Sequence, residues 1–589
     1  MDNGPPSDLK FFLLRRVAPP RYGRSGQADG SIYRVSLPPV TRTRSLEEAS
    51  RTNDMSPSPR GKFVLNPLTS ALLVVLSSPA DAQSGLVVDG RKCTLAEAIA
   101  AANTDTATGG CPAGQGADTL QLTATTYRLA AALPPITSTI TLFGDPDHDR
   151  QNVVIEPEPG SHSLPFSLLV VGPGGDLTVK RINLQNAGVH GIVVDYQALN
   201  PDDWFPYSGT DARLQLVQSK VSGNARSGVL VANYARAEIR HSTISGNDRG
   251  ISCDGYAAQC TIDNSVISGN TSFGIYNRGS VKLNGSSVIG NGVGLRGEAF
   301  LGDRTIITNS TIANNLGSGL ELTREPRASL SNSTVSGNGG MGVDASGVFD
   351  YGGETLAFES STISGNRAGG VRVGKPQQGV YGLSLRNTVI TGNPGGDADC
   401  RNAYVTFLSG AVIGDGSCNA AAAGASVGDP KLGPLLDNGG STRTLALADD
   451  SLAIHAGDGA ACAGTDQRNA LRPRDPACDS GAFERISAVA PAIKPTLEFF
   501  DAEVKAGRLV GARAPGKPYR VQAVRNQLLL TGDFTSRHAM KPACTQITRT
   551  LHRVDQDGIG PDGNDYVTGP SSPELVSRLA ALRSDLGCK

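Results

Sequence analysis

The sequence has few of the residues that usually build a single packed core, and it has no excess charge of either sign. Aromatic residues make up 5% of the 589 residues and include one Trp, whereas Gly occurs 72 times. This mixture is typical of chains with recurring tight turns, and the length suits two or three domains or one long repeat array. Lys and Arg number 54 against 55 Asp and Glu, a net charge of −1. Without a basic surplus to neutralise phosphates, we expect no nucleic-acid partner.

The ten cysteines contain no C-x-x-C pair, a spacing common in zinc and redox sites. They occur instead as five pairs whose members are close in sequence, which suits disulfides formed in an oxidising compartment. Free or metal-binding thiols are the alternative. We therefore predict five local disulfides, which join Cys93 to Cys111, Cys253 to Cys260, Cys400 to Cys418, Cys462 to Cys478, and Cys544 to Cys588.

The chain also lacks an apolar run of about 20 residues, the length that spans a bilayer as a helix. A shorter uncharged stretch, residues 68–76, follows two basic residues and precedes an A-x-A sequence at 80–82. This order predicts a secretory signal peptide over 55–82. We expect the mature chain to start near Gln83 and to be extracellular or held at the cell surface, with no transmembrane segment.

Residues 1–54, ahead of this signal, are rich in Pro, Arg and Ser and show no sustained periodicity, which is typical of a disordered segment. Signal peptides act from the N-terminus, so we predict that translation starts at Met55 and that residues 1–54 are not part of the protein. An unusually long basic region ahead of the signal is the alternative.

A repeat centred on Ser-Gly-Asn and its variants occupies the middle of the chain. Its Asn recur at intervals of 21 to 28 residues, and most are followed within four positions by Gly and an apolar residue. Short β-branched alternation, as in Thr243-Ile244-Ser245, predicts strands of two to four residues. One period holds three strands and three turns. We therefore predict a right-handed parallel β-helix over 83–428, whose coils bury their apolar residues only by stacking.

The repeated Asn suggest an internal ladder. We predict that each Asn takes the left-handed conformation at a tight bend, and that its amide bonds the Asn of the coils above and below. Such a ladder satisfies buried polar groups, so these Asn are interpreted as structural. A weaker earlier copy is Asn186. The ladder residues are Asn224, Asn247, Asn270, Asn291, Asn315, Asn338, Asn366 and Asn393.

The open ends of parallel sheets need protection. Thr94-Leu95-Ala96-Glu97 is a capping box, and apolar residues at helical spacing follow it. We predict a helix over 94–103 that closes the N-terminal end of the solenoid.

Two segments resemble a known family. Cys93-Thr94-Leu95-Ala96-Glu97-Ala98-Ile99 resembles the C-S-L-R-E-A-I motif of bacterial surface β-helix proteins, with Ala96 in place of the motif's Arg. Residues 429–485 are similar to a choice-of-anchor C-terminal region of variety Q, from which Asn469 and His455 depart. The resemblance implies a solenoid at the cell surface or in the medium and no established reaction. The matching segments in this region are 437–442, 466–468, 472–473 and 478–484.

Residues 486–589 have a different pattern, which predicts a small C-terminal α/β module. Ser572 as the cap, Pro573 at the first helical position and Gly587 after the last turn frame a terminal helix.

Four carboxylates in this module have a spacing that suits a hard cation. Asp555, Asp557, Asp562 and Asp565 suggest a Ca²⁺ loop, although Tyr566 stands where an EF-hand has Glu. A solvated acidic turn is the alternative, and Ca²⁺ is the one cofactor that the sequence suggests.

The long insertions in the repeat all follow the Gly-apolar strand and precede the next strand, so we expect them on one side of the solenoid. Insertions that share a face often mark a binding face. Aromatic rings beside carboxylates suit sugars, whereas aromatics that only cover the coil edge are the alternative. The candidate ligand-binding residues are Asp202, Asp203, Trp204, Tyr207, Tyr234, Tyr256, Asp350, Tyr351 and Tyr381.

Three functions are consistent with these patterns. The first is a non-catalytic exported monomer that binds polysaccharide or cell-surface glycans through this side. The second is a polysaccharide lyase or glycoside hydrolase of pectin-lyase-like fold. The third is a stalk that presents residues 486–589. Asp202-Asp203 and Val189-His190-Gly191 resemble polygalacturonase motifs, but the order and an Arg-x-Lys signature are missing, so we assign no catalytic residue. Two carboxylates within about 10 Å beside a cation would favour the enzyme.

Overall fold

The computed structural model describes most of residues 85–588, and the segments assigned above to the N-terminal extension and the signal peptide lie outside the described residues. No helix in the described part of the chain combines the length and the hydropathy needed to cross a bilayer. Within 85–588 the description omits 145–151, 161–164, 196–211, 299–303, 325–326, 349–355, 375–381, 396–398, 402–404, 419, 421–423, 474–476, 513–518 and 557–563.

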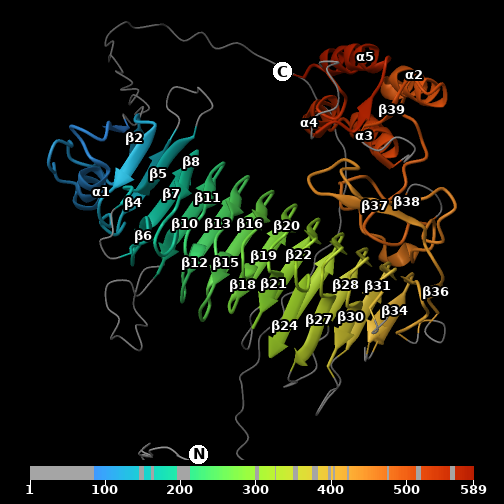
Figure 1. Ribbon diagram of the computed structural model, residues 1–589, viewed down its shortest axis with the longest axis horizontal. Coiled ribbons are helices and arrows are strands. Elements are labelled where there is room, and N and C mark those ends of the chain that lie inside the picture. The colour runs from blue at the N-terminus through green and yellow to red at the C-terminus, as the bar shows by residue number, and fades with distance from the viewer. Residues whose placement is uncertain are drawn as a thin grey trace, which may run out of the picture. The chain divides into compact units, whose positions relative to one another are not determined.

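Three parallel sheets wind around a common apolar core, and the strand order within each sheet follows the chain (Figure 1). This confirms the predicted right-handed parallel β-helix. Sheet 1 contains β1 (Leu86–Val88), β2 (Ala117–Leu122), β4 (Thr139–Phe143), β7 (Asp176–Lys180), β10 (Arg213–Val217), β13 (Arg236–Arg240), β16 (Gln259–Asp263), β19 (Ser280–Asn284), β22 (Arg304–Thr308), β25 (Arg327–Ser331), β28 (Leu356–Glu359), β31 (Leu383–Arg386) and β34 (Val405–Ser409).

The other two sheets have the same serial order. Sheet 2 contains β3 (Thr126–Leu129), β5 (Val153–Pro157), β8 (Ile182–Gln185), β11 (Lys220–Ser222), β14 (Thr243–Ser245), β17 (Val266–Ser268), β20 (Ser287–Ile289), β23 (Thr311–Ala313), β26 (Thr334–Ser336), β29 (Thr362–Ser364), β32 (Val389–Thr391), β35 (Val412–Ile413) and β36 (Ser426–Val427). Sheet 3 contains β6 (Leu169–Val171), β9 (Ile192–Val194), β12 (Ser227–Val231), β15 (Arg249–Cys253), β18 (Phe273–Asn277), β21 (Val293–Gly297), β24 (Leu320–Arg324), β27 (Met341–Val348), β30 (Gly369–Val373) and β33 (Cys400–Arg401).

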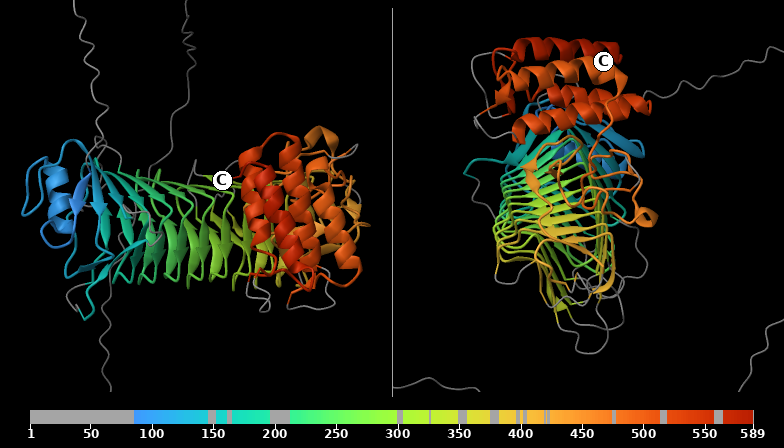
Figure 2. Two further views of the ribbon diagram at one scale, coloured as in Figure 1. Left: turned by 90° about the horizontal axis from the view of Figure 1, so that it is seen from above. Right: turned by 90° about the vertical axis from the view of Figure 1, so that its right-hand side faces the viewer.

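Side chains along each strand point alternately into the core and towards the surface. In β13, Ala237 and Ile239 are buried while Arg236 and Arg240 are exposed. The in-register neighbour of Ile239 on the next coil is Ile262, which is also buried, so apolar side chains stack in columns. The strands that carry these columns follow one another along the solenoid (Figure 2). Each coil therefore depends on its neighbours both for hydrogen bonds and for burial of its apolar residues.

Two side-chain ladders run along the inside of the stack. The amide Nδ2 of Asn224 donates to Oδ1 of Asn247 at 2.8 Å, and this contact is repeated from coil to coil as far as Asn366 and Asn393. A second ladder runs through the Ser five residues earlier, where the backbone N–H of one Ser donates to Oγ of the next, from Ser219 to Ser361. Both ladders satisfy polar groups that the stack buries.

The predicted backbone of the ladder Asn is wrong, although the ladder itself is present. The left-handed residue is the one before each ladder Asn, such as Gly223 with φ of 68°. Asn186 has φ of 63° and occupies this bend position, because Gln185 is in register with Ser222. The ladder position of that coil is Ala187, whose N–H donates to Oδ1 of Asn224 at 2.9 Å.

The N-terminal end of the solenoid is closed by α1 (Leu95–Thr104), which confirms the helix predicted over 94–103. Thr94 Oγ1 accepts from the backbone N–H of Glu97, and Glu97 Oε2 accepts from the backbone N–H of Thr94 at 3.0 Å. The buried face of the helix belongs to the same apolar cluster as the first strands. All five predicted cysteine pairs are disulfides in the structure: 93–111, 253–260, 400–418, 462–478 and 544–588.

Residues 429–485 dock on the outer face of sheet 2. They include a hairpin of β37 (Leu432–Leu436) and β38 (Thr444–Leu447) and a short 3-10 helix, η1 (Gly459–Ala461). Gln467 Oε1 accepts from Thr334 Oγ1 at 2.6 Å, and Gln467 Nε2 donates to Thr311 Oγ1 at 2.9 Å. The backbone N–H of Ala482 donates to Thr362 Oγ1. The Thr residues on successive strands of sheet 2 thus form the docking column for this region.

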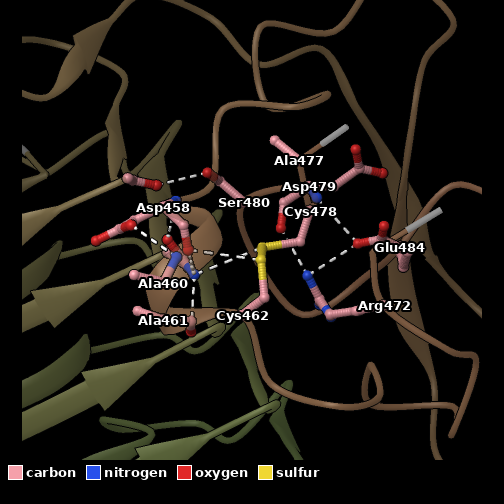
Figure 3. Close-up of a disulfide and its surroundings, with 12 residues drawn as sticks. Asp458, Ala460, Ala461, Cys462, Arg472, Ala477, Cys478, Asp479, Ser480 and Glu484 are labelled. Carbon is pink, nitrogen blue, oxygen red and sulfur yellow. Dashed lines mark hydrogen bonds and ion pairs between the residues drawn. A yellow bond between two sulfur atoms is a disulfide. The ribbon is translucent and has the colours of Figure 1, made fainter. Parts of the chain in front are cut away.

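The charged residues of the family-like segments are buried supports of this docked region. Arg468 is 1% exposed, lies 2.7 Å from Asp466 and stacks on the ring of Phe483. Arg472 pairs with Glu484 at 3.1 Å, close to the Cys462–Cys478 disulfide (Figure 3). Buried charges are tolerated when they are paired and hydrogen-bonded, so these residues hold the region together.

Among its described residues, the C-terminal module contains four α-helices, a short 3-10 helix and one two-stranded sheet. Its terminal helix begins at Ser572, but the cap position belongs to Ser571, one residue earlier than predicted. Gln527 Nε2 donates to the carbonyl of Asp437 at 2.7 Å, which joins the module to the docked region. The elements are η2 (Pro491–Ile493), α2 (Lys494–Lys505), β39 (Val510–Gly511), α3 (Tyr519–Ser536), α4 (Met540–Leu551), β40 (Val567–Thr568) and α5 (Ser572–Asp585).

Candidate binding surface

The connections from sheet 3 to sheet 1 lie along one side of the solenoid, because both sheets stack in register. We call this the loop side. The predicted ligand-binding residues divide into two groups. Tyr234 and Tyr256 are described. The others lie outside the described residues: Asp202, Asp203, Trp204, Tyr207, Asp350, Tyr351 and Tyr381.

Tyr234 and Tyr256 form an exposed aromatic pair on neighbouring coils. Their ring centroids are 5.5 Å apart with an interplanar angle of 70°, and the two residues are 38% and 61% exposed. The backbone holds the pair in place, since Tyr234 N donates to the Tyr256 carbonyl and Tyr256 N donates to Asn233 Oδ1 at 2.7 Å. The Cys253–Cys260 disulfide spans the loop that carries Tyr256. A loop whose backbone is held in this way loses little conformational entropy when its aromatic ring binds a ligand.

A column of polar side chains continues on the outer face of sheet 3, where sequence analysis made no prediction. Each member follows a buried apolar residue of its strand and is in register with the next. We call this set the charged strip; its column comprises Tyr276, Arg296, Glu321, Asp344 and Arg372, and Glu298 lies beside it.

Hydrogen bonds and ion pairs connect the members of the strip. Tyr276 Oη donates to Glu298 Oε2 at 3.0 Å, and Arg296 Nε donates to Glu298 Oε1 at 2.9 Å. Arg296 also lies 3.6 Å from Glu321. Farther along the strip, Arg372 Nε donates to Asp344 Oδ1 at 3.1 Å.

Aromatic rings lie at the end of the strip nearest the tyrosine pair. The guanidinium of Arg249 is 4.7 Å from the centroid of the Tyr276 ring and 5.7 Å from that of Phe273. Such stacking orients the guanidinium and leaves its edge free to donate hydrogen bonds. The surface thus changes from exposed aromatic to charged groups over successive coils.

The pKa values of the two adjacent carboxyl groups of the strip, Glu321 and Asp344, are shifted in opposite directions. Burial raises the pKa of Glu321 above its ordinary value, and the neighbouring Asp344 carboxylate acts in the same direction. Burial also disfavours the charged form of Asp344, but hydrogen bonds from Arg372 and Ser346 outweigh it and hold the pKa of Asp344 below its ordinary value. Burial, together with the bond to Glu298, raises the pKa of Tyr276.

A sequence signal for this strip exists. The outward residue two positions after the repeat Gly is Leu230 or Ser252 in two coils, then Tyr276, Arg296 and Glu321 in the following coils. Replacement of uncharged residues by charged ones in one outward column is visible once the register is known. The predicted binding residues all lie in the insertions, so the strip was not among them.

The predicted Ca²⁺ loop is partly described. Asp555 and Asp565 are buried, and Asp555 Oδ2 accepts from Thr568 Oγ1 at 2.8 Å, whereas Asp557 and Asp562 lie outside the described residues. Within the described ranges, no three His, Cys, Asp or Glu side chains are grouped as a metal site. The Ca²⁺ site stays a prediction.

Comparison with known proteins agrees with the fold. The family model for the right handed beta helix region matches residues 167–347, and no curated protein matches the chain. The solved structures similar to this chain at low identity include the following two. The Azotobacter vinelandii mannuronan C-5 epimerase AlgE6 A-module is 17% identical with a TM-score of 0.39, covering 55% of this chain and 95% of its own. Pectate lyase Pel9A is 15% identical with a TM-score of 0.35, covering 64% and 92%.

Proposed function

We propose that this protein is an exported, monomeric solenoid that binds a polysaccharide chain through the aromatic pair on its loop side and the charged strip on the adjoining outer face of sheet 3. The observation that carries this proposal is the exposed Tyr256 ring, which lies in the loop after β15, one coil before the strip of hydrogen-bonding groups begins at Tyr276. Sugar rings stack an apolar face on an aromatic ring and hydrogen-bond through their hydroxyls. Five disulfides support export to an oxidising compartment.

The dimensions of the surface suit an extended ligand. Seven neighbouring strands of sheet 3, from β12 to β30, carry the surface. Six spacings of about 4.8 Å give it a length of roughly 29 Å. The strip's cations are paired with its carboxylates, so both kinds of group offer hydrogen bonds without a large net charge. This balance favours an uncharged or weakly charged polysaccharide over a polyanion.

Binding measurements with a panel of neutral and acidic polysaccharides test the proposal. Tyr256→Ala should weaken binding of the best ligand by about tenfold, equivalent to about 1.4 kcal/mol for one aromatic anchor. The matched control is Tyr519→Ala, which removes an exposed tyrosine of the C-terminal module. Equal losses from the two variants, or binding of no polysaccharide, would contradict the proposal.

A second candidate function is cleavage of the bound chain. Glu321 and Asp344 are in register on neighbouring strands, their pKa values are shifted apart, and Arg296 and Arg372 flank them. A carboxyl of raised pKa beside one that stays ionised is the arrangement that acid–base hydrolysis of glycosides uses. Analysis of products after incubation with the panel tests this. Products that disappear in both Glu321→Gln and Asp344→Asn, with binding retained, would establish the enzyme in place of the non-catalytic protein.

A further inference from the structure

A pocket of about 590 Å³ lies between the outer face of sheet 2 and the C-terminal module, away from the loop side. Its floor is formed by β17 and β20. Its walls come from residues 440–443, the end of α4 and Asn564. The walls are fixed by contacts that need no ligand: Gly440 N donates to Gln546 Oε1 at 2.9 Å, and Thr442 Oγ1 donates to the Asn309 carbonyl at 3.1 Å.

The pocket is strongly basic although the whole chain has a net charge of −1. Arg443, Arg549, His552 and Arg553 line it, against one carboxylate, Asp437. That carboxylate is already paired, since Arg553 lies 2.8 Å from it.

The remaining arginines have no carboxylate partner among the described residues. Arg549 donates to the carbonyl of Gly440, a neutral acceptor that leaves its charge uncompensated. Arg443 makes no ion pair within the described ranges and is exposed to the pocket. The carbonyl end of the α4 dipole offsets part of this charge, typically by a fraction of one unit. Several cations that line one concave site focus the positive potential there and attract anions.

The floor of the pocket favours a ligand that has an apolar face in addition to an anionic group. Val266 and Ile289 present apolar surface to it, and Ser268 and Ser287 lie beside them with hydroxyl groups. An inorganic anion would use the arginines alone. A ligand with a polar ring and an anionic group would use the whole lining, and the volume lies in the range that small organic ligands occupy.

We propose that this pocket binds a sugar-sized organic anion, in which a carboxylate or a phosphate faces Arg443 and Arg549 and the ring rests on Val266 and Ile289. Because the lining comes from the solenoid, the docked region and the C-terminal module, the ligand stabilises the contact among all three. The stabilisation follows the ligand concentration relative to its dissociation constant.

Calorimetric titration of the purified protein with glucuronate, glucose 6-phosphate, inorganic phosphate and glucose tests the proposal. We expect saturable binding of at least one sugar anion, at least tenfold tighter than that of glucose and of inorganic phosphate. The two sugar anions distinguish a carboxylate ligand from a phosphate ligand. Arg443→Ala should weaken this binding at least tenfold, and higher salt should weaken it as well.

Two controls keep the test specific. Arg485→Ala removes an arginine that pairs with Asp449 outside the pocket, and it should leave the binding unchanged. Tyr256→Ala on the loop side should also leave it unchanged, which separates this site from the polysaccharide surface. Binding of neither sugar anion, or an Arg485→Ala loss equal to that of Arg443→Ala, would overturn the proposal. Thermal unfolding without ligand verifies that each variant is folded.

Discussion

The amide of Asn393 donates to Asp399 rather than to another Asn, with Nδ2 of Asn393 lying 2.7 Å from Oδ1 of Asp399. The backbone N–H of Asn393 donates to the same oxygen at 3.2 Å. Asp399 is 2% exposed, so the ladder ends in a buried carboxylate. Burial raises the pKa of Asp399 above its ordinary value, more strongly than the two bonds from Asn393 lower it.

Asp399→Asn should therefore stabilise the protein near neutral pH. A carboxyl whose pKa is raised by folding contributes stability below its unfolded pKa, and that contribution is lost as the pH rises through the folded value. The variant keeps an acceptor for Asn393 and removes the buried charge. The urea midpoint at pH 7 should rise, and the gain should shrink towards pH 4. As a control, Asp415→Asn should not stabilise, since hydrogen bonds hold the pKa of Asp415 below its ordinary value. A gain from Asp399→Asn that does not depend on pH would contradict this account.

Asn270→Leu should destabilise the stack. Oδ1 of Asn270 accepts two bonds from Asn247, and its Nδ2 donates to Asn291. Removing it leaves buried donors without a partner, at a cost of about 1–3 kcal/mol. Urea unfolding measures the loss. The outward substitution Thr261→Ala on the same coil should change stability by less than about 0.5 kcal/mol. Equal effects of the two substitutions would show that the ladder contributes little.

Gln467→Ala should loosen the docked region from sheet 2. The side chain bonds Thr311, Thr334 and Thr442, and its loss leaves their buried hydroxyls with fewer partners. We expect limited proteolysis to cut within 429–485 faster in this variant than in the unaltered protein, while the solenoid strands stay protected. Arg485→Ala, which removes an exposed ion pair in the same region, is the control. Unchanged cleavage rates would mean that other contacts hold the region.

Trp204→Ala should weaken polysaccharide binding by more than about tenfold, or about 1.4 kcal/mol, because a Trp ring offers the largest apolar face for a sugar. Trp204 lies outside the described residues, so its role stays a prediction from its place in the longest insertion. Folding should be nearly unaffected, since loops contribute little to the stacking of coils. If the substitution unfolds the protein, the ring covers the coil edge instead.

The repeat made the fold predictable from sequence because its period reports directly on the coil. The same repeat misled the backbone assignment, since Gly223 and Asn224 are neighbours and both residue types tolerate left-handed bends. The hydrogen bonds of the side chains explain the assignment. An Asn in the ladder forms buried hydrogen bonds to both neighbouring coils, whereas the bend needs only a residue that adopts positive φ, which Gly does at no steric cost.

The surfaces were harder to predict. The Thr334–Gln467 contact joins residues 133 positions apart, and no local pattern encodes such a pairing. The basic pocket likewise requires the solenoid, the docked region and α4 to meet. The charged strip could have been predicted from the sequence, because Glu321 and Asp344 occupy equivalent positions of the repeat. Its signal lies in the outward positions of the strands, whereas the repeat itself is defined by the inward ones.

The amide ladder has a direction. From Asn224 to Asn393 every Nδ2 donates towards the C-terminal coil and every Oδ1 accepts from the N-terminal side. Such a chain can be lengthened by inserting a whole coil anywhere within it, since each new Asn accepts two bonds from the coil before it and donates two to the coil after it, as Asn270 does. Its last member needs only an acceptor, and Oδ1 of Asp399 supplies it. The ladder therefore has a fixed polarity and a defined end. The number of coils can vary, but a carboxylate cannot replace an Asn within the ladder, because it has no N–H to donate to the next coil.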